Sequence, residues 1–272
     1  VFDGDLSRET RPTADGFGAG QGLVLRGTKA ITIENCEFRN WVRALVISQS
    51  SDIVVRGNEI HAIRSDGVDF AGVTQVLVEN NHFHDFARAP AAGDHADMIQ
   101  FWTNGTKTPT VDVTIRDNIF NSGHGLYTQS IFIRNEEVDT KRQGREMYYR
   151  NLVITGNVIV NAHLHGITVG ETDGLMIANN TLIRNRLSDG PGGSDGLWTP
   201  AIRVSPAAEN VTITRNITPN ITGPEKHAKR AGAAASWRVM DNLLIQDRDP
   251  DAQGYYDAVF VAARSGDPAT LA

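Results

Sequence analysis

The sequence predicts an all-β fold with a single domain, a parallel β-helix (solenoid) in which the chain winds through about eight to nine stacked coils. Two observations predict it. Eight six-residue segments superimpose with apolar residues at positions one and three, the alternation of a strand with one buried face. Their sixth position is Asn in seven of the eight. Aromatic residues make up only 7% of the 272-residue chain, which favours a core of small repeated layers.

The repeated segments follow one another at intervals of 22 to 39 residues, because loops lengthen some coils beyond the bare unit. Helical repeats of similar length would show a 3.6-residue period, which these segments lack. The segments are 31–36, 53–58, 76–81, 113–118, 152–157, 175–180, 211–216 and 237–242.

Each unit also contains a strand with a small–apolar–variable–apolar pattern and a short third strand, such as Glu59-Ile60. The patterned strands lie at 22–25, 44–47, 67–70, 98–101, 130–133, 166–169 and 201–204. Stacked coils lie about 4.8 Å apart, so equivalent side chains should form columns. We expect one buried column of amides with a structural role, formed by Asn58, Asn81, Asn118, Asn157, Asn180 and Asn216. Cys36 replaces Asn in the first coil and is expected to be a buried, inert thiol.

Composition narrows the class of protein. The net charge of -6 disfavours a nucleic-acid binder that uses a broad basic surface. The longest apolar runs fall short of the roughly 18 residues of a membrane span, and one cysteine excludes an internal disulfide framework. We expect one domain over 1–272 with an irregular closing region at about 219–272. Val1 begins in mid-coil, so a capping segment is expected to lie outside this sequence.

Long insertions at 88–97, 103–110, 135–150 and 186–200 all flank the patterned strand, which predicts a groove over that strand. Its outward column reads Val24, Val46, Asp69, Gln100, Phe132, Thr168 and Arg203. The residues just before the strand read Gln21, Arg43, Asp66, Asp97, Gln129, His165 and Pro200, and two residues earlier lie Trp41, Arg64, His95, Tyr127, His163 and Trp198. The end coils have few ionisable side chains at these positions. The middle coils concentrate the groups that acid–base chemistry requires.

Several of these residues have a structural interpretation beside the functional one. Asp66 precedes Gly67 and also suits a turn. His95 lies between Asp94 and Asp97, and a neighbouring carboxylate orients an imidazole for proton transfer. His82 and His84 fall in the short third strand, away from the groove, and are predicted to be structural.

Aromatic and basic side chains extend the predicted groove. Trp102 and Trp198 suit either sugar stacking or the anchoring of loops. Lys141, Arg142 and Arg145 gather on one loop, which favours an anionic ligand or, alternatively, a solvated charged surface.

The repeating unit resembles the right-handed parallel β-helix of the pectate-lyase-like superfamily over about residues 20–245. Asp66-Gly67-Val68-Asp69 is similar to the DGID-type segment of polygalacturonases, and His165 to Gly170 is similar to their HGISIG segment. Arg203 stands where their RIK arginine would fall, but Ser205 replaces the lysine. Alginate C-5 epimerases have a D-P-H-[DE] signature whose Asp matches Asp69 and whose His position is Ala71. Calcium-dependent pectate lyases use clustered carboxylates, which Asp66, Asp69 and Asp97 could supply.

The resemblance implies a secreted or periplasmic enzyme that acts on an acidic, uronate-containing polysaccharide. The first hypothesis is an alginate-like polysaccharide lyase that works by β-elimination, with His95 or His163 as the base and Tyr127 as the acid. Arg134 with Gln100 or Gln129 would bind the uronate carboxylate, and Arg64, Trp102, His165 and Arg203 would line the substrate site. No cofactor is expected to be required, and calcium is left open.

Three alternatives remain open. A C-5 epimerase would share the proton-abstraction step, and a polygalacturonase-like hydrolase would use Asp66, Asp69 or Asp97 as acid and base. A non-catalytic glycan-binding solenoid would need only Trp102, Trp198 and Arg203. No nucleic-acid partner and no membrane span are expected, and the oligomeric state is not predicted.

Overall fold

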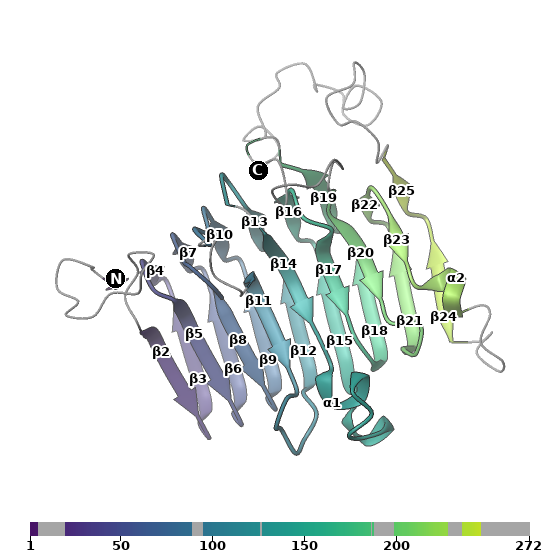
Figure 1. Ribbon diagram of the computed structural model, residues 1–272, viewed down its shortest axis with the longest axis horizontal. Coiled ribbons are helices and arrows are strands. Elements are labelled where there is room, and N and C mark those ends of the chain that lie inside the picture. Colours follow the sequence, from purple (N-terminus) through teal and green to yellow (C-terminus); the bar gives the residue numbers. More distant parts are fainter. Residues whose placement is uncertain are drawn as a thin grey trace.

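The computed structural model describes residues 1–4, 20–88, 95–125, 127–185, 187, 199–227 and 236–245. Over these residues the strands form three parallel sheets, here called A, B and C, and each coil of chain passes through sheet B, then C, then A. The coils stack side by side from the purple end of the chain to the yellow end (Figure 1). The predicted parallel β-helix is therefore confirmed, and eight successive coils lie within the described residues.

Sheet B holds the strands with the small–apolar–variable–apolar pattern. Its strands are β2 (Gln21–Arg26), β5 (Arg43–Ser48), β8 (Val68–Ala71), β11 (Ala96–Trp102), β14 (Thr128–Ile133), β17 (His165–Val169), β20 (Ala201–Val204) and β23 (Ile221–Thr222).

Sheet C holds the six-residue segments from which the repeat was recognised. Its strands are β3 (Lys29–Glu34), β6 (Ser51–Arg56), β9 (Thr74–Glu79), β12 (Val111–Arg116), β15 (Tyr149–Thr155), β18 (Thr172–Ala178), β21 (Glu209–Thr214) and β24 (Trp237–Met240).

Sheet A holds the short strands that follow the Asn turn. They are β1 (Phe2–Asp3), β4 (Glu37–Arg39), β7 (Glu59–His61), β10 (His82–His84), β13 (Ile119–Asn121), β16 (Val158–Asn161), β19 (Thr181–Arg184), β22 (Ile217–Thr218) and β25 (Leu243–Leu244). The strands β23, β24 and β25 form a further coil, which includes the predicted repeat segment at 237–242.

The turn between sheets C and A holds the predicted amide column. The side-chain amide nitrogen of Asn58 donates to the amide oxygen of Asn81 at 2.9 Å, and the same bond repeats through every coil to Asn242. The six predicted Asn residues are at most 2% exposed. The residue before each Asn, such as Gly57 (φ 62°) or Asn80 (φ 54°), adopts the left-handed conformation that closes the turn. The ladder is confirmed.

Cys36 corrects one detail of that prediction. Its backbone N–H donates to the amide oxygen of Asn58 at 2.9 Å, so it does occupy the ladder position. Its thiol contacts the Glu34 carbonyl oxygen at 3.3 Å, and the residue is only partly buried. The first coil has no preceding Asn ladder residue to cover it, so the predicted full burial is wrong.

The core is made of apolar layers that repeat from coil to coil. Phe70 stacks on Phe101 with ring centres 4.6 Å apart, and Phe83 stacks on Phe120 at 4.9 Å. All four rings are fully buried. This repetition explains how a chain with few aromatic residues fills its core: each ring covers the next.

The long connections lie on the two borders of sheet B, as predicted. The connections after β11 and β14 lead from sheet B to sheet C, and those after β10 and β19 lead from sheet A to sheet B. The turns from sheet C to sheet A are short. The connection after β14 contains the helix α1 (Glu136–Asp139) and a 3₁₀ turn, η2 (Arg145–Met147). A second four-residue helix, α2 (Pro224–His227), follows β23. Among the described helices none has the length and apolar character needed to cross a membrane.

Candidate functional site

The outward column of sheet B has the predicted register. Asp69 pairs with Gln100, Gln100 with Phe132, Phe132 with Thr168, and Thr168 with Arg203 in successive strands. From Asp69 to Arg203 the column crosses four strand spacings, or about 19 Å. One position differs: a register shift in β17 sets His165 beside Ala201 rather than Pro200. The register therefore places three of the predicted site residues, Asp69, Gln100 and Arg203, in one column.

Three carboxylates cluster at the start of β8 and β11. Asp66, Asp69 and Asp97 are 2%, 0% and 0% exposed, and the backbone N–H of Asp97 donates to a carboxylate oxygen of Asp66 at 3.2 Å. Arg43, one coil earlier, places its Nε 2.9 Å from Asp66 and 3.2 Å from Asp69. The repeat places Arg43 in the column just before the strand, but nothing in the sequence indicates its contact with the carboxylates. Asp66 is therefore an ion-pair partner and more than a turn residue.

Burial is the main electrostatic influence on this cluster. It raises the pKa of Asp66, and it raises the pKa of Asp69 well above its ordinary value, where the charge of Asp66 adds to the effect and Arg43 opposes it. Burial also raises the pKa of Asp97 to about 7, against the lowering effect of His95. A carboxyl group that titrates near neutral pH can take up and release protons under ordinary conditions.

His95 and Asp97 form a dyad at the edge of the cluster. The His95 Nδ1 lies 2.9 Å from the Asp97 Oδ2, while the His95 side chain is 46% exposed and the Asp97 side chain is fully buried. The His95 ring also contacts Phe132 in an edge-to-face arrangement, with ring centres 5.8 Å apart. The buried carboxylate therefore lies at ion-pair distance from an imidazole that faces solvent, with Nε2 as the ring nitrogen turned away from the carboxylate.

Tyr127 lies beside His95 in the next coil. Ala96 and Thr128 are paired between β11 and β14, so the residues just before them are neighbours across the two strands. The Arg88 guanidinium lies 4.7 Å from the centre of the Tyr127 ring. Tyr127 has a φ of 54°, a left-handed conformation that is costly for a bulky residue. Such strained residues cluster at functional sites.

His163 and His165 continue the row one coil further. The His163 ring lies 6.3 Å from that of Tyr127, and the His163 and His165 rings stack at 5.2 Å. The backbone N–H of His165 donates to His163 Nδ1 at 3.2 Å, and His165 Nδ1 is 2.7 Å from the Thr168 hydroxyl. Burial lowers the pKa of His163 to about 4 and that of His165 to about 3. Both are neutral near pH 7, and His163 Nδ1 is already an acceptor.

A pocket of about 300 Å³ opens at the far end of the row, over β14, β17, β20 and β23. Arg134, His165 and Arg203 line it, together with Glu171. Arg134 is paired with Asp139 of α1 at 3.0 Å. The predicted binders of the uronate carboxylate are therefore divided, because Arg134 lines this pocket and Gln100 and Gln129 do not.

The other predicted substrate contacts occupy intermediate positions. Gln100 and Trp102 share the outward side of β11, where both are partly exposed and Phe101 between them is buried. Gln129 is 6% exposed and pairs in register with Asp97, so it lies under the row rather than on its surface. Arg64 is partly exposed, and its backbone N–H donates to the Trp41 carbonyl oxygen. Asp94 and Trp198 lie outside the described residues.

The basic loop after β14 differs from the expectation of an anion-binding surface. Arg142 lies 3.3 Å from Glu137, and Arg145 lies 2.8 Å from Asp173, which belongs to β18 of sheet C. Each guanidinium therefore has an acidic partner within the protein, and Arg145 lies against sheet C rather than over sheet B. The sequence could not show these ion pairs, because the path of the loop decides which sheet its side chains contact.

Comparison with known proteins bears on the fold. The model of the right handed beta helix region matches residues 18–127. A comparison with curated proteins found no match. A mutant DFA-IIIase from Arthrobacter chlorophenolicus A6, in complex with DFA-III, has 10% identity and a TM-score of 0.41, over 87% of this chain and 46% of that one.

Two further solved structures are similar. A tailspike protein from the Acinetobacter baumannii bacteriophage Fri1, a capsular polysaccharide depolymerase, has 9% identity and a TM-score of 0.31, over 86% of this chain and 50% of that one. The catalytic unit of a GH87 alpha-1,3-glucanase from Streptomyces thermodiastaticus has 13% identity and a TM-score of 0.27, over 82% and 50%.

The chain spans about half the length of each of these structures. Three parallel sheets, a continuous Asn ladder and the family-model match lead to one conclusion. The chain is a right-handed parallel β-helix.

Proposed function

We propose that the protein is an enzyme that acts on an extended acidic polysaccharide by abstracting a proton, and that it is a lyase working by β-elimination. The observation that supports this best is the dyad of His95 and Asp97, 2.9 Å apart, with Tyr127 beside it in the next coil. The outward column of sheet B, about 19 Å from Asp69 to Arg203, also suits a linear polymer better than a small molecule.

The roles follow from the geometry. His95 accepts the proton on C5 of a uronate through Nε2, while Asp97 holds Nδ1 and stabilises the imidazolium that forms. Electrons from the C5–H bond form the C4–C5 double bond, and the C4–O bond breaks. The Tyr127 hydroxyl gives its proton to the departing oxygen. The Arg88 guanidinium, 4.7 Å from the Tyr127 ring centre, supplies positive charge for the uronate carboxylate.

Between the two histidines first considered as the base, His95 is the better supported. His163 Nδ1 already accepts a backbone hydrogen bond, and burial lowers the pKa of His163 to about 4, which makes it a weak base. A neutral His163 instead serves as a hydrogen-bonding group beside Tyr127. His165, whose Nδ1 contacts Thr168, forms part of the floor of the groove.

Hydrolysis is the second candidate, and the raised pKa of Asp97 favours it because a glycosidase needs a protonated carboxyl group. Two carboxyl groups must then reach the sugar. Asp66 and Asp69 are instead buried against Arg43, and Asp97 is buried behind His95. The partly exposed proton-transfer groups are His95 and Tyr127, and for this reason elimination is preferred.

The carboxylate cluster is a poor match for calcium. Calcium binds six to eight oxygen ligands, whereas here Arg43 lies between Asp66 and Asp69 and His95 lies against Asp97. We propose that the Arg43 guanidinium takes the place of a metal ion beside Asp66 and Asp69 and that turnover does not depend on calcium. A polysaccharide substrate would also place the protein outside the cytoplasm, as a secreted or periplasmic enzyme.

The test is incubation with alginate, pectate and glycosaminoglycans, with neutral glycans as controls. Elimination produces unsaturated uronates, detected by ultraviolet absorbance, and each cut also produces one new reducing end. His95→Gln and Tyr127→Phe should each lower turnover by about 100-fold or more. His124→Gln, an exposed histidine outside the row, is the matched control.

Other products would point elsewhere. New reducing ends without absorbance would mean hydrolysis, and altered uronate ratios without cleavage would mean C-5 epimerisation. Binding with no product on any glycan would contradict the enzyme proposal and favour a binding solenoid.

A further inference from the structure

A second cluster of ionisable side chains lies on sheet A, away from the groove. The strands β7 and β10 are neighbours, with Glu59 opposite His82 and His61 opposite His84. The middle residues of the two strands, Ile60 and Phe83, are fully buried. Side chains alternate along a strand, so the first and third residues of both strands share the outer face of the solenoid.

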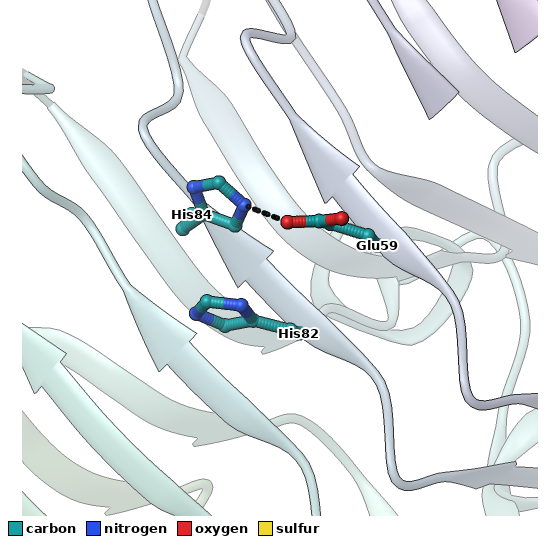
Figure 2. A group of neighbouring side chains, drawn as sticks. All are labelled: Glu59, His82 and His84. Atoms are coloured by element: carbon teal, nitrogen blue, oxygen red, sulfur yellow. Dashed lines mark hydrogen bonds and ion pairs between the residues drawn. The ribbon is translucent and has the colours of Figure 1, made fainter. Parts of the chain in front are cut away.

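Glu59, His82 and His84 each offer one ligand atom, and these atoms lie within 4.8 Å of one another. Figure 2 shows His82 and His84 side by side on one strand and Glu59 reaching toward His84 from the neighbouring strand. The His84 Nε2 is 3.2 Å from the Glu59 carboxylate, and the two imidazole ring centres are 4.3 Å apart.

These separations suit a tetrahedral metal ion. Ligand atoms at the usual zinc distances of about 2.0–2.2 Å lie about 3.4 Å from one another. The Glu59 and His84 atoms already meet that spacing. His82 is exposed, so its side chain can rotate to close the remaining gap without movement of the strand.

His84 is also oriented as a metal ligand usually is. Its Nδ1 lies 2.8 Å from the Asp85 carboxylate, which leaves Nε2 directed at Glu59. A carboxylate on the far ring nitrogen is the common outer-shell partner of a metal-bound histidine. The His84 ring also stacks on His61 at 4.8 Å with an interplanar angle of 4°, and His61 contacts Glu37 at 3.0 Å.

We propose that Glu59, His82 and His84 bind a divalent transition-metal ion, with water completing the coordination. Two imidazoles and one carboxylate favour zinc, copper or nickel over calcium or magnesium. The ion would connect β7 to β10 and so tie two successive coils together. This site is independent of the proposed chemistry in the groove, because it lies on a different sheet.

The experiment is a calorimetric titration of the metal-free protein, prepared without a polyhistidine tag, with Zn²⁺. We expect one ion to bind per chain at this site with micromolar affinity and Tm to rise by several degrees. His82→Gln and His84→Gln should each weaken binding by about 10-fold or more. Replacement of Zn²⁺ by Co²⁺ should give the intense visible absorption of a four-coordinate ion.

Two control variants separate this site from others. His124→Gln removes a histidine that is not in the cluster and should leave the affinity unchanged. Asp97→Asn tests the other group of potential ligands, Asp66, His95 and Asp97. The proposal is wrong if Zn²⁺ produces neither heat nor a rise in Tm, if His82→Gln and His84→Gln bind like the unaltered protein, or if Asp97→Asn is the variant that loses binding.

Discussion

Two columns of buried polar side chains run along this solenoid, and they differ in how completely their atoms are paired. In the Asn ladder, the amide nitrogen of Asn118 donates to the Val78 carbonyl oxygen at 3.0 Å and to Asn157, and its oxygen accepts from Asn81. In sheet B, neither carboxylate oxygen of Asp69 accepts a well-formed hydrogen bond from the described residues, although Arg43 lies 3.2 Å away.

This difference in hydrogen-bond pairing distinguishes a structural column of side chains from a functional one. A fully satisfied buried network specifies and stabilises a fold, whereas buried groups with incomplete pairing cost free energy. A protein retains such groups where they perform chemistry. The ladder is therefore expected to stabilise every coil, and the carboxylate cluster is expected to lower stability while Asp97 supports proton transfer by His95. The following variants test that contrast.

The largest effect on stability is expected in the middle of the ladder. Asn118→Ala removes an amide that bonds above and below, and it leaves buried backbone and amide groups without partners. Each such group costs about 1–3 kcal/mol, so we expect the free energy of unfolding to fall by about 3 kcal/mol in denaturant titrations. Asn242→Ala, at the partly exposed end of the ladder, is the control and should cost clearly less. Equal losses at both positions would contradict the ladder account.

A smaller effect is expected at Arg43. Arg43→Met leaves Asp66 and Asp69 buried without their cation, and we expect a loss of about 2 kcal/mol because Arg43 itself is partly exposed. The double variant Arg43→Met with Asp69→Asn should recover part of this loss, since the amide carries no charge. A double variant less stable than Arg43→Met alone would show that Arg43 acts through packing and that charge compensation is not its role.

The effect that is smallest near neutral pH is a pH dependence at His163, because it develops only as the pH falls below 6.5. Its pKa of about 4 in the folded state lies below the unfolded value of 6.5, so the unfolded chain binds more protons between these values. Stability should therefore fall as the pH drops from 6.5 to 4, by up to about 1.4 kcal/mol per pH unit from this group. His163→Gln should lack that contribution. Parallel denaturation curves of both proteins across this range make the measurement, and identical pH slopes would refute it.

The ladder could be predicted from the sequence because its residue recurs in phase with the strand pattern, and a parallel stack brings equal positions together. For the same reason the outward column from Asp69 to Arg203 was predicted in register. The partner of each side chain was harder to predict. Arg43 lies in an end coil with few ionisable side chains in the groove columns. Its contact with Asp66 depends on the direction in which its long side chain points.

Departures from strict repetition were also missed. The register shift in β17 moves Ala201 beside His165, since an alignment of equal units cannot anticipate a local irregularity. Arg145 pairs with Asp173 because its loop folds toward sheet C, and no pattern in the sequence fixes that path. The metal cluster on sheet A combines an ordinary His-x-His strand with a glutamate 23 residues earlier, so only the coil register brings the three together.

The most direct test of the contrast is the variant Asp97→Asn, with unfolding free energy and glycan turnover measured on the same preparation. Burial raises the pKa of Asp97 to about 7 from 3.8, so the native state loses stability as the pH rises through this range, and a neutral amide avoids that cost. At pH 8 we expect Asp97→Asn to be at least as stable as the unaltered protein, with turnover lower by about 100-fold or more. A loss of stability as large as that of Asn118→Ala, with turnover retained, would contradict the account.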